Sequence, residues 1–213
     1  MRRYDAIVFD MDGVLLDSEP LHYAALNTAL SMRLSREEYE QFIGTRTEAM
    51  LSDLIARYDL RRSHAEYLHE YDAAVLEQLQ EPRPPADGVV ALMQFARDLG
   101  MRLALASSSR RVWIDASLRS LGLADAFDAI VSGDEVSAGK PDPQIYLIAA
   151  SRLGISPRAC LAIEDAPNGV ASARAAGMTV LGVRTPYTAH LQLDGVALTV
   201  DSLADLDLDQ WFN

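Results

Sequence analysis

The amino-acid sequence predicts an α/β protein with a doubly wound parallel sheet, interrupted by an inserted all-helical domain. Two observations support this prediction. Beyond residue 88, short apolar runs alternate with amphipathic runs of about ten to fifteen residues, a pattern typical of right-handed crossovers that cover both faces of a parallel sheet. Before it, one strand-like run precedes a long stretch that shows only helical periodicity.

The first strand is predicted over residues 4–9, where an apolar run ends in an acidic loop. Pro20 can then open a helix, because the first helical turn needs no N–H from that residue. Helical patterning continues to about Leu79, and the three prolines of 81–88 cannot continue a helix. We therefore expect a core domain and an inserted helical cap, with bounds 1–15 plus 88–213 for the core, 16–87 for the cap, and hinges near 15–19 and 81–87.

The remaining elements alternate between helix and strand. Glycines that follow the last apolar position, such as Gly100, Gly122 and Gly154, predict where three helices end. The strands are short and rich in apolar residues, as expected for a buried sheet. We expect helices at 89–100, 110–123, 143–154 and 167–177, and strands at 101–107, from 129, at 159–165, at 178–183 and, at the edge, near 198.

Composition limits the classes of function. The 213 residues are 49% apolar and carry a net charge of −12, which argues against nucleic acid or an anionic membrane surface as a partner. No apolar run approaches the roughly eighteen residues of a membrane span, and the N-terminal run is too short for a signal peptide. With the lone Cys160 expected to be a buried thiol, these features predict a soluble cytoplasmic protein.

The sequence DMDG places Asp10 and Asp12 directly after the first predicted strand. Residues two apart share one side of a strand, so the two carboxylates should emerge together, and Gly13 lets the chain turn. Two like charges at this separation favour a cation between them or protonation of one carboxylate. An acidic turn that only ends the strand is the structural alternative.

Polar residues also follow the other predicted strands. Parallel strands present their carboxyl ends at one edge of the sheet, where ligands bind. These residues are Asp10 and Asp12, the serines Ser107, Ser108 and Ser109, Lys140 in the sequence GKP, and Glu164 with Asp165. Carboxylates can bind Mg²⁺, and a lysine with serine hydroxyls can hold an anion, so the set suits a phosphate monoester.

Each of these features has a structural alternative. Ser107 could belong to a turn, although three serines after a buried strand form a natural anion pocket. Lys140 could be a solvated loop lysine, and Glu164 with Asp165 could cap the helix that begins at Pro167. Capping and metal binding do not exclude each other.

Four motifs in order resemble the haloacid dehalogenase-like superfamily, and they span essentially the whole chain: DMDGVLLDSEPLH, ALASSS, GKPDP and IEDAPNGV. The helical insertion after the first motif resembles the cap of its β-phosphoglucomutase-like and sugar-phosphatase branch. The resemblance implies Asp10 as the nucleophile that forms an aspartyl-phosphate. It implies Asp12 as the general acid and base, which the dehalogenase branch does not need, so phosphoryl transfer is favoured.

The resemblance also assigns the remaining core residues. It implies that Mg²⁺ is held by Asp10, the backbone carbonyl of Asp12, and Asp165, with Glu164 as a further ligand or a partner of the ligands. Ser107 and Lys140 would bind the phosphoryl oxygens.

Positions in the cap distinguish water from a sugar hydroxyl as the phosphoryl acceptor. His22 matches a histidine of β-phosphoglucomutases, and Gly44 matches their substrate loop. Where those enzymes place an arginine for the second phosphate, this chain has Thr47, with Arg46 as its neighbour, and residues 20–87 contain no lysine. We expect His22, Gly44, Arg46, Thr47, Ser108 and Ser109 to contact the substrate.

A mutase needs cations at both ends of a bisphosphate, and the cap offers few. The sequence therefore favours a Mg²⁺-dependent phosphatase that acts on small phosphorylated metabolites such as sugar phosphates. A β-phosphoglucomutase is the alternative, and a non-catalytic binding module is a remote one. No nucleic-acid or membrane partner is expected, and we expect a monomer or a weak homodimer.

Overall fold

The computed structural model describes residues 3–43, 45 and 47–212. The chain divides into two compact units, each described here by itself. The core unit comprises residues 1–17 and 82–213, and the inserted unit comprises residues 18–81.

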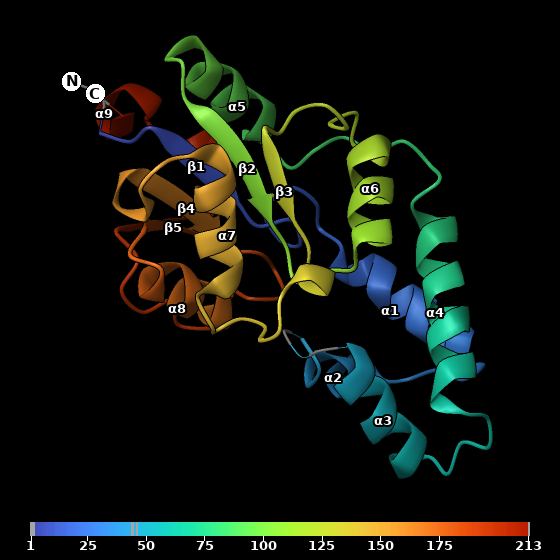
Figure 1. Cartoon of the computed structure of the whole chain (residues 1–213). Coiled ribbons are helices and arrows are strands. Elements are labelled where there is room, and N and C mark those ends of the chain that lie inside the picture. Colours follow the sequence, from blue (N-terminus) through green and yellow to red (C-terminus); the bar gives the residue numbers. More distant parts are fainter. Residues whose placement is uncertain (1–2, 44, 46, 213) are drawn as a thin grey trace. The chain divides into compact units, whose positions relative to one another are not determined.

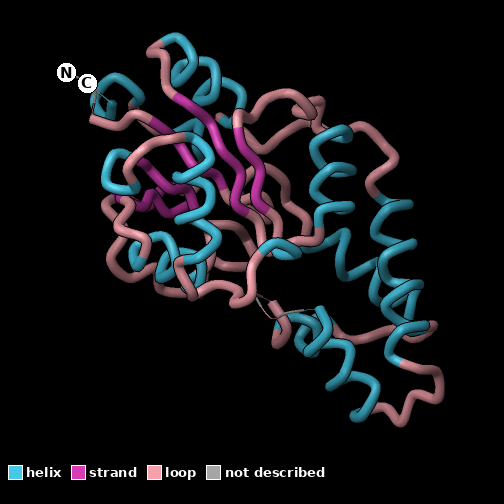
Figure 2. Tube along the Cα trace, viewed as in Figure 1, coloured by secondary structure: helices cyan, strands magenta, loops and turns pink. Residues whose placement is uncertain are grey.

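The core unit is built on a parallel sheet of six strands within the described residues, in the order β3-β2-β1-β4-β5-β6. Figure 1 labels β1 to β5, and Figure 2 draws the strands in magenta. The chain fills one half of the sheet from β1 outward and then returns to fill the other half from β4. The strand order therefore reverses beside β1, and the predicted doubly wound parallel sheet is confirmed. The strands are β1 (Ala6–Phe9), β2 (Arg102–Ala106), β3 (Ala129–Val131), β4 (Cys160–Glu164), β5 (Thr179–Val183) and β6 (Leu198–Val200).

Helices bury both faces of this sheet. All four residues of β1 are buried, although alternate residues point to opposite faces. Val8 lies in a cluster with Tyr146 of α7 and Val170 of α8, so these two helices cover one face. On the core unit the helices are α5 (Val89–Asp98), α6 (Arg111–Ser120), α7 (Gln144–Leu153), α8 (Pro167–Ala175) and α9 (Leu208–Phe212).

The elements agree with the sequence prediction to within a few residues, but one α-helix in the described part of the chain was not predicted. That helix, α9, has five residues and docks through Phe212, which is fully buried and makes ring contacts with Tyr4 and Phe95. Such a short segment gives too little periodicity to predict a helix. Capping of α8 by Glu164 or Asp165 is wrong: Ala166 is the N-cap, without a side-chain cap hydrogen bond.

The described part of the inserted unit contains helices and no strand. Helix α1 packs along α4, and α3 also contacts α4. Two of its helices begin with a capping box, Ser35 with Glu38 and Ser63 with Glu66, which satisfies backbone donors that a helix start leaves open. The helices are α1 (Glu19–Leu30), α2 (Arg36–Glu40), α3 (Thr47–Arg57) and α4 (His64–Gln78).

Within the described residues, every helix is too short or too polar to cross a bilayer. Cys160 is fully buried at the start of β4, as the sequence predicts. Burial, with a smaller contribution from the nearby Asp5, raises the pKa of this thiol to about 11.

Candidate active site

Asp10 lies at the carboxyl end of β1, beside the point where the strand order reverses. Its backbone N–H donates to the carbonyl of Ile163 over 3.0 Å, so the pairing between β1 and β4 extends to Asp10. Gly13 then turns the chain with a φ of +77°. A Cβ atom there would lie 2.1 Å from Oδ2 of Asp165, so only glycine allows the turn to approach that carboxylate.

Lys140 joins the ends of β1 and β4. Its Nζ donates to Oδ1 of Asp10 over 2.9 Å and to Oε1 of Glu164 over 2.6 Å. The side chains are 8%, 11% and 1% exposed, respectively, so this ion pair is shielded from solvent. Burial alone would lower the pKa of Lys140, but the two carboxylates outweigh burial and raise it, which keeps the ammonium charged.

Glu164 has two further close neighbours that the sequence did not single out. The hydroxyl of Tyr146, a fully buried residue of α7, donates to the same Oε1 that binds Lys140. A Cβ atom at Gly169 would lie 2.0 Å from that oxygen, so glycine there makes room for the carboxylate. Burial, followed by the charge of Glu164, raises the pKa of Tyr146 well above its ordinary value, so its hydroxyl remains a donor.

Three buried carboxylates, Asp10, Glu164 and Asp165, each offer an oxygen within 4.8 Å of the others. Burial is the main reason that the pKa of Asp10 is raised to about 7; Glu164 and Asp12 raise it further, against the effect of Lys140. Burial, then Asp10 and Glu164, also raises the pKa of Asp165 well above its ordinary value. Clustered carboxylate oxygens that repel one another form a donor set that suits a hard divalent cation such as Mg²⁺.

The serines after β2 form part of the same strand-end region. Ser107 is fully buried, and its Oγ accepts from the backbone N–H of Ser109 over 3.1 Å. The hydroxyl of Ser109 donates to Oδ2 of Asp12 over 2.7 Å. Ser108 is exposed. A Cβ atom added at Gly133 would lie 2.1 Å from the carbonyl oxygen of Ser108, so glycine there allows the two loops to approach. In this conformation Ser109 therefore orients Asp12, the candidate proton donor.

The structure thus brings the predicted core residues together at one edge of the sheet. Of the residues predicted to contact the substrate, His22 and Thr47 lie in the inserted unit. His22 is half-buried on α1, and its Nδ1 lies 2.8 Å from the hydroxyl of Tyr71. Thr47 begins α3. Gly44 and Arg46 lie outside the described residues, and the roles of all these positions stay predictions.

The sequence matches the family model "haloacid dehalogenase-like hydrolase" over residues 4–177. The chain therefore belongs to the haloacid dehalogenase-like hydrolases, and the predicted family and its hydrolase class are confirmed.

Two curated relatives and one solved structure illustrate the similarity. Hexitol phosphatase B of Escherichia coli (strain K12) is 33% identical over 190 residues, which cover 87% of this chain and 86% of that protein. Beta-phosphoglucomutase of Bacillus subtilis (strain 168) is 32% identical over 214 residues, covering 96% and 92%. The crystal structure of CbbY from Rhodobacter sphaeroides in complex with phosphate matches with a TM-score of 0.86, 28% identity and 96% coverage of each chain.

Proposed function

We propose that the protein hydrolyses phosphate monoesters of small metabolites, such as sugar phosphates, with Mg²⁺ and through a covalent aspartyl-phosphate on Asp10. The observation that supports this most is the buried contact of Lys140 with Asp10 and Glu164 beside Asp165. This contact supports the proposal because a carboxylate that can attack phosphorus, an ammonium that can bind phosphate and carboxylates that can bind Mg²⁺ then lie next to one another.

Hydrolysis needs two steps at Asp10. In the first, a carboxylate oxygen of Asp10 forms a bond to phosphorus while the bond from phosphorus to the leaving oxygen breaks, and Asp12 gives a proton to that oxygen. In the second, Asp12 takes a proton from water, whose oxygen bonds to phosphorus as the bond to Asp10 breaks. Inorganic phosphate leaves, and both carboxyl groups return to their starting states.

The negative charge of the phosphoryl group would be neutralised by a bound cation, by Lys140 and by a hydrogen bond from Ser107. Asp10, Asp165 and Glu164 would hold Mg²⁺, together with the backbone carbonyl of Asp12. When bound, the ion reduces the repulsion between the anionic nucleophile and the anionic phosphoryl group. Lys140 can bind a phosphoryl oxygen with its remaining N–H, and the Ser107 hydroxyl can donate to another.

The relatives support a phosphorylated carbohydrate as the substrate class. One is named a hexitol phosphatase and another a β-phosphoglucomutase, and both names imply a carbohydrate that carries a phosphate. The second name also keeps the mutase alternative, in which a sugar hydroxyl replaces water as the acceptor. The cap sequence, with Thr47 where the mutases place an arginine and no lysine over residues 20–87, favours the phosphatase.

The first experiment measures phosphate release from p-nitrophenyl phosphate with Mg²⁺ and with EDTA, followed by a panel of phosphorylated metabolites. We expect turnover that depends on Mg²⁺ and is fastest with sugar or sugar-alcohol phosphates. Absence of metal-dependent turnover on every compound would contradict the proposal and favour a non-catalytic binding module.

The second experiment distinguishes hydrolysis from transfer of the phosphate to another hydroxyl of the same sugar. The protein receives β-glucose 1-phosphate with a trace of the bisphosphate, and the products are followed over time. We expect free phosphate to accumulate. Conversion to glucose 6-phosphate faster than phosphate release would favour the mutase.

A further inference from the structure

The loop that carries Lys140 contains little regular structure near the lysine. Between β3 and α7 it forms one short 3₁₀ turn, Gly133–Glu135, and Lys140 follows Gly139, where an added Cβ would meet no atom within 4 Å. Yet the ammonium must reach Asp10 and Glu164 at 2.9 and 2.6 Å. The backbone of this loop therefore needs a support outside the active site.

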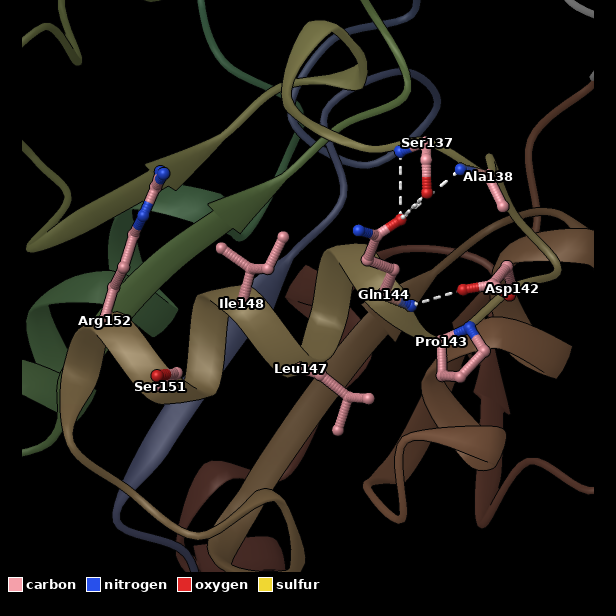
Figure 3. A pocket seen from close by; sticks show the side chains of 9 residues that line it. All are labelled: Ser137, Ala138, Asp142, Pro143, Gln144, Leu147, Ile148, Ser151 and Arg152. Carbon is pink, nitrogen blue, oxygen red and sulfur yellow. Dashed lines mark hydrogen bonds between the residues drawn. The ribbon is translucent and has the colours of Figure 1, made fainter.

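Gln144, the first residue of α7, provides such a support (Figure 3). Its Oε1 accepts from the backbone N–H of Ser137 over 3.0 Å, from the Ser137 hydroxyl over 3.0 Å and from the backbone N–H of Ala138 over 3.3 Å. Among the residues that the structure describes, no other side chain accepts from these two backbone amides. One amide oxygen thus fixes the loop just before Lys140.

The same loop is fixed on the other side of Lys140. The backbone N–H of Gln144 donates to Oδ1 of Asp142 over 2.9 Å, and the backbone N–H of Asp142 donates to the carbonyl of Gly139 over 3.0 Å. The hydroxyl of Ser172, on α8, donates to the carbonyl of Asp142 over 2.6 Å. The chain from Ser137 to Gln144 is therefore a closed loop whose two ends meet at the Gln144 side chain.

We propose that Gln144 is a positioning residue that places the Lys140 ammonium through the backbone of this loop. The hydrogen bonds of its side chain go to Ser137 and Ala138 and not to Asp10, Glu164 or Asp165. Its side chain lines a pocket of about 670 Å³ outside the carboxylate cluster, shared with residues such as Leu147 and Arg152. The proposal rests on the proposed function of Lys140, and it predicts that the required property of residue 144 is an acceptor oxygen at the end of a side chain of this length.

Two substitutions and one control test this requirement. Gln144→Leu keeps the approximate size of the side chain and removes the acceptor. Gln144→Glu keeps an acceptor oxygen, and a carboxylate is also favourable in the first turn of a helix. Leu147→Ala is the matched control, because Leu147 lies on the same helix and lines the same pocket, is 42% exposed, and has an aliphatic side chain that cannot hydrogen-bond to the loop.

The sequence provides a direct probe of the position of Lys140, because it is the only lysine in the chain. Protein labelled with ¹³C-lysine should give one side-chain ε-CH₂ signal. We expect this signal to shift or broaden in Gln144→Leu and to stay at its wild-type position in Gln144→Glu and Leu147→Ala. An unchanged signal in Gln144→Leu would overturn the proposal, whether or not the protein turns over any substrate.

The activity measurement uses p-nitrophenyl phosphate and Mg²⁺. We expect Gln144→Leu to lower kcat about tenfold, since a small misplacement of a charge-stabilising group has large effects on rate, while the other two variants stay within about twofold of wild type. In a Lys140→Met background, Gln144→Leu should lower kcat by no more than about twofold, because its effect is exerted through the lysine.

The outcomes separate the two proposals. If the double variant loses kcat by the product of the two single losses, Gln144 does not act through Lys140, and the proposal is overturned. Full activity of Lys140→Met would contradict the proposed role of the lysine, and the lysine signal would then decide the positioning role alone. If Gln144→Leu does not fold, Gln144→Ala replaces it in every measurement.

Discussion

The ion pairs of Lys140 in the core unit and of Arg62 in the inserted unit show how differently such contacts behave in buried and exposed surroundings. In the core unit, Lys140 binds Asp10 and Glu164 where all three side chains are at least 89% shielded from solvent. In the inserted unit, Arg62 binds Glu70 through two N–H groups, and these side chains are 37% and 43% exposed. Both contacts join a cationic side chain to a carboxylate, but the surroundings differ.

The surroundings reverse the effect on the carboxylate. A hydrogen bond from Arg62 is the main reason that the pKa of Glu70 falls below its ordinary value, as expected for a solvated pair. The pKa of Asp10 rises to about 7 although Lys140 lies beside it, because burial and neighbouring carboxylates outweigh the ammonium. The core pair therefore belongs to a group of buried charges that destabilises the folded protein, and a bound cation would reduce this destabilisation.

The largest expected effect comes from the nucleophile. Asp10→Asn should lower kcat by about 10⁴-fold or more, because an amide oxygen cannot replace the attacking carboxylate. Without Mg²⁺, the same substitution should raise the unfolding midpoint at about pH 8, since a folded-state pKa above the unfolded value makes the charged form destabilising at high pH. The assay is p-nitrophenyl phosphate hydrolysis combined with thermal unfolding.

Asp125→Asn is the matched control for Asp10, because Asp125 is an exposed aspartate of the same unit. It should change neither kcat nor the unfolding midpoint. Substantial turnover by the Asp10→Asn variant would refute the role of Asp10 as the nucleophile.

Removal of the buried cation should have the second largest effect. Lys140→Met leaves Asp10 and Glu164 without their ammonium partner. Loss of one member of a buried pair costs about 3 kcal/mol of unfolding free energy. The loss should grow as pH rises through the range in which the buried carboxylates ionise, and Mg²⁺ should restore part of it. Chemical denaturation with and without Mg²⁺ measures both effects, and a variant as stable as wild type under all conditions would contradict this account.

The raised pKa of Asp10 predicts a moderate effect of pH on metal binding. Because the pKa of Asp10 is about 7, this carboxyl group is mostly protonated in the metal-free protein at lower pH, and Mg²⁺ must then displace a proton. We expect the Mg²⁺ affinity to fall by up to about tenfold for each pH unit below 7, with release of a proton on binding. Calorimetry in buffers of different ionisation enthalpy measures this proton, and an affinity independent of pH would show that the carboxylates are already ionised.

The smallest effect is expected for the exposed pair. Glu70→Gln should leave the unfolding midpoint of the protein unchanged within error, because water solvates both partners and salt screens their attraction. Thermal unfolding at low and high salt tests this. A loss as large as that of Lys140→Met would break the contrast between the two units.

Most of the fold could be predicted from sequence because the features that determine it are periodic. Buried parallel strands such as Ala6–Phe9 are continuous apolar runs, and glycines mark the ends of the intervening helices. The candidate site could be predicted because its charged residues follow directly after strands, and strand ends converge in this topology. Lys140 is also the only lysine of the chain, which is a further sequence signal of a specific role.

Two residues near the site could not be predicted from the sequence, because one contacts Glu164 from within a helix and the other contacts the backbone of the Lys140 loop. Tyr146 occupies an apolar position of α7, where a buried aromatic residue is expected for packing alone, and only the structure shows its hydroxyl on Glu164. Gln144 is an ordinary polar residue in a first helical turn. Its contacts with Ser137 and Ala138 depend on how the preceding loop closes, which no periodic pattern encodes.

The glycines at positions 13 and 169 restrict how this protein can change. Each lies where a methyl group would overlap a carboxylate, that of Asp165 in one case and that of Glu164 in the other. Even alanine, the smallest replacement, would displace an acidic side chain from the cluster. Mutational routes to new substrates are therefore closed at these two positions, and divergence must proceed through residues farther from the acids.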